Sequence, residues 1–239
     1  MIEAARNFVC IRIATYEDKT EAQFVIDRVM SEGDDLRNFG YALASPGFET
    51  IVERSNRGPN FTYGSAEEMA AKLNSISEEY TSTLPENSLP GLPKMKDVRL
   101  AMNVASCDGL PCLVVFGNSE EERQRLQQKM GVVAWDPEIA GKFIYASTSE
   151  AADLAELGGD GISSGYLVVQ PDPYGLKGEI ITTISEPRSA ERLKSELLSA
   201  VENYHRVSKT HGQHVRSGRQ NGVVWETEVE VPKRDRIRG

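Results

Sequence analysis

Apolar and polar residues follow one another in short blocks that predict alternating strands and helices. The clearest block is Cys112–Phe116, an uninterrupted apolar run typical of a buried parallel strand. After Gly117, the charged stretch Ser119–Met130 predicts a helix. The other expected strands are Phe8–Ile13, Phe39–Ala44, Glu49–Arg54, Phe143–Ser147, Tyr166–Gln170 and Gly178–Ile184. The other expected helices are Thr20–Met30 with Thr20 as N-cap, Ala66–Glu79, Lys94–Ala105, Glu150–Leu157 and Ser189–Tyr204.

This order of elements predicts an α/β protein with two domains. We expect a first domain over residues 1–80 and a second over residues 94–204. Residues 81–93 contain three prolines and predict an extended linker. The remaining 205–239 predict a separate basic tail.

The tail carries its own strand signal. Asn221-Gly222 is the strongest short hairpin-turn motif. Beyond it, apolar or β-branched residues alternate with glutamates from Trp225 to Val231, as in a half-buried strand. We therefore expect a C-terminal β-hairpin that packs on one of the two sheets.

Two short matches indicate that the two domains share one fold. Glu3–Phe8 aligns with Glu138–Phe143, and Gly40-Tyr41 aligns with Gly165-Tyr166. In both domains the order strand, helix, hairpin, helix follows. The shared order predicts a duplicated fold.

Charge and composition narrow the possible partners. The 239-residue chain has a net charge of −9, which argues against nucleic acid or an anionic membrane as the main partner. No apolar run has the length of a membrane span, and the first residues do not resemble a signal peptide. As written, the chain is expected in the cytoplasm; a trimmed upstream segment would instead allow a secreted or periplasmic protein. Three cysteines give neither a disulfide framework nor a metal-ligand pattern, and Cys10 and Cys112 are expected to be buried in strands.

Element order and strand texture resemble the thioredoxin-like superfamily. PCLVVFG is similar to the first central strand of that fold, WDPEIAGKFIYAS to the helix end and strand that follow, and GYLVVQPDPYGLKGEII to its antiparallel hairpin. The family keeps Cys-x-x-Cys at the start of the helix after the first central strand, where the helix dipole favours a thiolate. Those positions fall at Glu121 and Gln124 here, and Ser163-Ser164-Gly165 stands where the family has a cis-proline. The resemblance thus implies tandem thioredoxin-like domains without thiol exchange, and no cofactor is expected.

The first domain lacks an equivalent of the strand and helix at 112–135. A sheet without that central strand would leave a hydrogen-bonding edge open. Three explanations remain: the natural chain starts further upstream, the sequence was trimmed, or another strand of this chain or of a partner fills the gap.

Several residues are candidates for chemistry, each with a simpler structural explanation. Cys107 and Cys112 flank a turn and would make a redox pair, although Asp108 disfavours a thiolate there. The histidines of the tail could ligate a transition metal, but no carboxylate or thiolate stands among them; they are His205, His211 and His214. Two acidic groups, Glu120–Glu122 and Asp136–Glu138, would suit acid–base catalysis or simply helix starts.

Binding candidates lie elsewhere. Arg57 and Asn60 belong to a polar loop after the first hairpin, where an arginine could hold a carboxylate or phosphate. Tyr166 opens the second hairpin. Connection alone would also explain such a loop.

These features predict a non-catalytic binding or scaffold protein that engages a partner polypeptide or a second copy of the chain. The alternative is a thiol–disulfide oxidoreductase whose Cys-x-x-Cys lies upstream of Met1. A third hypothesis makes Cys10 or Cys107 a lone redox-sensing thiol.

Overall fold

The computed structural model describes residues 1–30, 36, 40–55, 58–80, 91–158, 162–206, 210–224 and 227–230. The chain forms two compact units: unit 1 contains Met1–Pro85 and Trp225–Gly239, and unit 2 contains Glu86–Val224. Both combine helices and strands, so the protein is of mixed α/β class. In the described part of the chain, no helix is both long and apolar enough to cross a membrane.

Unit 2 is built on one four-stranded sheet with the order β4-β3-β5-β6. Its strands are β3 (Cys112–Phe116), β4 (Ile144–Thr148), β5 (Gly165–Pro171) and β6 (Gly178–Ile184). Its helices are α5 (Val98–Asp108), α6 (Glu120–Ala134), the 3-10 helix η2 (Ala151–Leu157), α7 (Ala190–Glu202) and α8 (His211–Gln220). The central strand β3 is parallel to β4 and antiparallel to β5, and β6 is antiparallel to β5. Each of the four strands matches a sequence prediction to within one or two residues.

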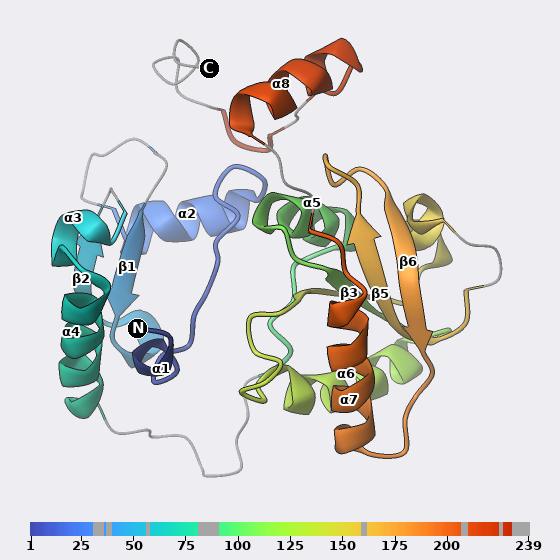
Figure 1. Ribbon diagram of the computed structural model, residues 1–239, viewed down its shortest axis with the longest axis horizontal. Coiled ribbons are helices and arrows are strands. Elements are labelled where there is room, and N and C mark those ends of the chain that lie inside the picture. Colours follow the sequence, from blue (N-terminus) through green and yellow to red (C-terminus); the bar gives the residue numbers. More distant parts are fainter. Residues whose placement is uncertain are drawn as a thin grey trace. The chain divides into compact units, whose positions relative to one another are not determined.

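Alternation along β3 divides the core of unit 2 into two layers. Leu113 and Val115 pack with α6 and α7 on one face of the sheet. Cys112, Val114 and Phe116 pack with α5 and η2 on the other. Figure 1 shows these helices around the sheet. All five residues of β3 are buried, as expected for a central strand covered on both faces.

Side-chain caps set the helix starts of unit 2. Ser119 and Ser189 accept hydrogen bonds from the backbone N–H three residues later, as their Ser-x-x-Glu and Ser-x-x-Arg sequences allow. The helix predicted from Lys94 starts only at Val98, because Asp97 caps it by accepting from Leu100 N at 2.7 Å. Lys94 instead makes an isolated parallel bridge with Tyr145.

Unit 1 has a smaller sheet, the antiparallel hairpin β1-β2. Its elements are α1 (Ile2–Ala5), α2 (Lys19–Arg28), β1 (Tyr41–Ala44), the 3-10 helix η1 (Pro46–Phe48), β2 (Ile51–Ser55), α3 (Asn60–Tyr63) and α4 (Ala66–Glu78). The hairpin and α4 confirm the predictions, and Ser65 caps α4 as expected. The core consists of Ala22, Val25, Val29 and Leu36, with Ala42 and Ile51 of the hairpin packed against it.

Two expectations for unit 1 were wrong. Within the described residues, no strand forms over Phe8–Ile13, and Val9 and Ile11 are largely exposed. A strand requires a hydrogen-bonded neighbour, and β-branched composition alone does not supply one. The cap of α2 is Asp18 rather than Thr20: its carboxylate accepts from the backbone N–H of Thr20 and Glu21.

The predicted tail hairpin is also wrong where the structure describes it. Residues 211–220 form helix α8, and Asn221-Gly222 ends this helix with Gly222 at a φ of 72°. A left-handed glycine terminates helices as readily as it forms hairpin turns. Trp225, Glu226 and residues 231–239 lie outside the described residues, as do residues 81–90 of the predicted linker.

Candidate binding surface at the start of α6

Four elements of unit 2 meet at one edge of its sheet. The carboxyl ends of the parallel strands β3 and β4 lie there, since Phe116 pairs with Thr148. The antiparallel strand β5 begins at the same edge, where Gly165 pairs with Phe116. Helix α6 starts directly after β3. In open α/β sheets, this edge is where ligands usually bind.

Gly117 lets α6 start close to the sheet. It is buried, and its N–H donates to the Thr148 carbonyl at 3.2 Å. A Cβ atom at this position would lie 2.3 Å from the backbone nitrogen of Arg123. Any larger side chain would therefore push the first turn of α6 away from the strand ends.

Glu122 joins the first turn of α6 to the start of β5. Its carboxylate accepts from Asn118 N at 2.8 Å and from the Ser164 hydroxyl at 2.9 Å. These two hydrogen bonds lower the pKa of Glu122. Ser164 directly precedes β5, so this contact closes the side of the edge that faces β5.

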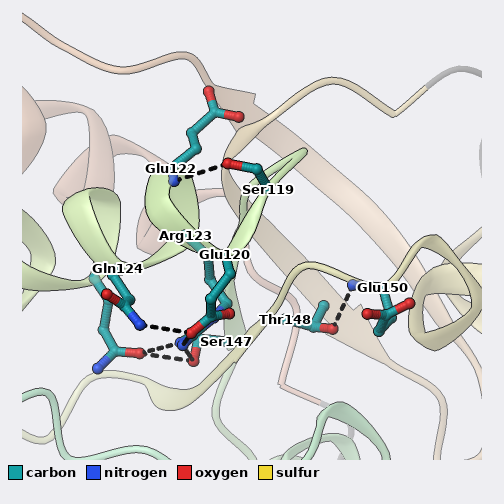
Figure 2. Close-up of polar contacts among 9 residues, drawn as sticks. Ser119, Glu120, Glu122, Arg123, Gln124, Ser147, Thr148 and Glu150 are labelled. Atoms are coloured by element: carbon teal, nitrogen blue, oxygen red, sulfur yellow. Dashed lines mark hydrogen bonds and ion pairs between the residues drawn. The ribbon is translucent and has the colours of Figure 1, made fainter.

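A second network joins α6 to β4. Arg123 donates from Nε to Glu120 at 2.7 Å, and from one terminal nitrogen to the Ser147 hydroxyl at 3.0 Å and to the Gln127 side chain at 2.7 Å. The Arg123 guanidinium and the Gln124 amide lower the pKa of Glu120 to about 2. Figure 2 shows the Glu120 and Glu122 side chains leaving the helix in different directions, each with its own partners.

The carboxylates at this edge are arranged for charge and not for proton transfer. Each glutamate of the first turn of α6 has a lowered pKa, because backbone, Ser or Arg groups donate hydrogen bonds to its charged form. A general acid at neutral pH would need a raised pKa. Nearby, the Thr148 hydroxyl donates to Asp153 at 2.6 Å, which leaves this carboxylate hydrogen-bonded as well. The arrangement presents a structured acidic surface; we call it the α6-start surface, residues 117–123 with Ser147, Thr148 and Ser164.

The cysteines lie elsewhere and in contrasting surroundings. Cys10 is exposed, contrary to the prediction of a buried thiol, because the strand expected around it does not form. Cys107 is exposed in the last turn of α5. Cys112 is fully buried in β3, and burial raises its pKa to about 12. The described structure contains all three, and none forms a disulfide.

This contrast predicts the order of thiol reactivity. At neutral pH in the folded protein, iodoacetamide should modify Cys10 and Cys107, whereas Cys112 should stay unmodified, because it is both inaccessible and protonated. Peptide mass spectrometry of the native chain checks this, with the urea-unfolded chain as control, in which all three should react. Modification of native Cys112 as fast as Cys107 would contradict the buried position.

The other candidate residues are dispersed. Tyr166 is fully buried, and its hydroxyl donates to the Leu126 carbonyl at 3.1 Å, so it holds α6 on the sheet and its ring faces the core. Asn60 is exposed at the start of α3 in unit 1, and Arg57 lies outside the described residues. His211 and His214 belong to α8, where the His214 ring stacks on Tyr174 with centroids 4.5 Å apart.

Sequence reasoning passed over the two partners that organise the α6-start surface. Arg123 lies among glutamates and looks like an ordinary surface charge, and Ser164 was noted only as the position of a missing proline. The Glu122–Ser164 contact joins residues 42 positions apart, and no local signal marks it. The ends of β3 and β4 were, however, a foreseeable location.

Comparison with known proteins leaves the chain without a relative to guide its assignment. In the described residues, no group of three or more His, Cys, Asp or Glu side chains is placed to hold a metal ion. The comparisons with family models, curated proteins and solved structures found no match.

Proposed function

We propose that unit 2 is a thioredoxin-like domain that has no thiol chemistry and binds a partner polypeptide at the α6-start surface. The observation that carries the proposal is the sheet order β4-β3-β5-β6, with one parallel and two antiparallel pairs and with α6 between the parallel strands. In the family that this order resembles, the start of the equivalent helix faces the substrate. Here that place holds Glu120, Glu121 and Glu122.

The same comparison extends to unit 1. The order of α2, the hairpin β1-β2 and α4 repeats the order of η2, the hairpin β5-β6 and α7. This shared order supports a partial second copy of the fold, whose contribution would be to present further binding surface.

Charge indicates the chemistry of the partner. The α6-start surface and the residues that follow β4 carry five carboxylates, those of Glu120, Glu121, Glu122, Glu150 and Asp153. Arg123 and Arg125 are the cations beside them, and Arg125 also pairs with Glu186. A polypeptide rich in Lys or Arg would complement this surface, and its association should weaken with salt.

Panning the intact chain against displayed random peptides tests this function. We expect enrichment of basic peptides that crosslink to a photoreactive residue at exposed Asn118, but not to one at exposed Glu202 on α7. Ser164→Ala should weaken their binding, because it frees the Glu122 side chain, whereas the neighbouring exposed Ser163→Ala should not.

Two results would refute the proposal. Equal crosslinking from Asn118 and Glu202 would remove the binding surface. Catalytic reduction of insulin disulfides by the intact chain would refute the non-catalytic assignment. Sedimentation over a range of concentrations asks whether a second copy is the partner.

A further inference from the structure

A short segment near the C-terminus lies against the beginning of α2 in unit 1. The segment is Thr227–Glu230, named here the C-terminal strap. The backbone N–H groups of Glu228 and Val229 both donate to the Tyr16 carbonyl, at 3.0 and 3.3 Å. The N–H of Lys19, the first residue of α2, donates to the Glu228 carboxylate at 3.3 Å. The strap is thus held by main-chain groups on both sides and by one carboxylate.

The side chains of the strap divide into an inner and an outer set. Val229 is partly buried and packs against the core of unit 1, which contains Ala22, Val25 and Val29. Glu228 and Glu230 are exposed. An extended peptide with one acidic residue followed by one branched apolar residue makes each of these contacts.

The electrostatics of the contact favour exchange. The dipole of a helix start attracts one carboxylate, and Asp18 already accepts from Thr20 N and Glu21 N of α2. Glu228 is a second carboxylate at the same helix start, so the two repel each other. The strap therefore occupies its place with few hydrogen bonds, one apolar side chain and an opposing like charge.

We propose that the surface formed by Tyr16, Lys19 and the core face of α2 is a peptide-recognition site, and that the C-terminal strap is its intramolecular occupant. The external ligand is an extended segment of another polypeptide with an acidic residue followed by Val or Ile. This site is on unit 1, and it is independent of the basic-peptide function proposed for unit 2. Because a tethered segment competes at a high effective concentration, the strap sets a threshold that an external ligand must exceed.

A trans-peptide experiment on the full chain tests the site. The probe is a fluorescently labelled peptide of residues 223–231, and binding is followed by anisotropy. Glu228→Lys puts a positive charge at the start of α2 and should release the strap, so this chain should bind the probe at least about tenfold more tightly than the wild type does. Glu230→Lys makes the same charge change at an exposed position and should bind like the wild type. A probe with Val229→Asp should not bind.

Equal affinities of the wild-type and Glu228→Lys chains would overturn the proposal, as would no binding to a Glu228→Lys chain that retains its circular dichroism spectrum. Hydrogen exchange on the wild-type chain gives a second criterion. Saturating unlabelled probe should speed exchange at the chain's own Glu228 and Val229 amides, while α2 stays protected. Unchanged exchange at those amides under saturation would show that the strap is not displaced and would also overturn the proposal.

Discussion

Replacing Leu113 with alanine is expected to lower the free energy of unfolding of unit 2 by about 2–5 kcal/mol. Leu113 is completely buried in the central strand β3 and packs in the layer between the sheet and the pair α6 and α7. Strands flank it on both sides, so the neighbouring backbone has little freedom to collapse into the space that the side chain leaves. The loss therefore includes both the transfer of the removed atoms and a cavity.

Urea denaturation followed by tryptophan fluorescence measures this loss. A Trp225→Phe background leaves Trp135 as the sole tryptophan, which belongs to unit 2 and whose indole N–H donates to the Gly91 carbonyl. Leu176→Ala in the exposed turn of the β5-β6 hairpin is the matched control and should change stability by less than about 1 kcal/mol. Equal losses for the two variants would contradict the assignment of Leu113 to the core.

Gly117→Ala is expected to cost about 1–3 kcal/mol and to disturb the α6-start surface as well. The added Cβ would lie 2.3 Å from the Arg123 nitrogen, and this contact is between backbone atoms on one side and a fixed Cβ on the other, so neither can rotate away. The first turn of α6 must move, which lengthens the contacts of Glu122 with Ser164 and of Arg123 with Ser147.

The same fluorescence experiment measures the stability, and binding of the selected basic peptides measures the surface. Gly212→Ala is the control: it lies within α8 with open space around its Cβ position. We expect the control to leave both properties unchanged. A Gly117→Ala protein with wild-type stability would show that α6 does not start as closely to β3 as the structure has it.

Local signals accounted for much of unit 2. A serine three residues before a glutamate predicted the start of α6, and the Ser119 side chain does accept from Glu122 N. The apolar run of β3 predicted a strand buried on both faces, and it is the centre of the sheet. These features depend on neighbours in sequence or on burial, and both are visible in the order of residues.

The wrong predictions share a physical cause: the competing structures depend on distant partners. Phe8–Ile13 has the composition of a strand but no strand neighbour in the described chain, so its side chains are exposed. Asn221-Gly222 suits a hairpin turn, but the preceding residues hydrogen-bond as a helix and Gly222 ends it. At the α6-start surface the location followed from the sequence, whereas the Ser164 partner of Glu122 came from the pairing of β5 with β3.

The two-part composition of unit 1 has a consequence for synthesis on the ribosome. Residues 1–85 emerge first, yet the strap that packs on their core is made only after all of unit 2. Unit 2 is continuous in sequence and can fold as soon as it leaves the exit tunnel. Completion of the first-made part therefore waits for the last-made part, and the nascent chain exposes the empty Tyr16 site to chaperones throughout translation of unit 2.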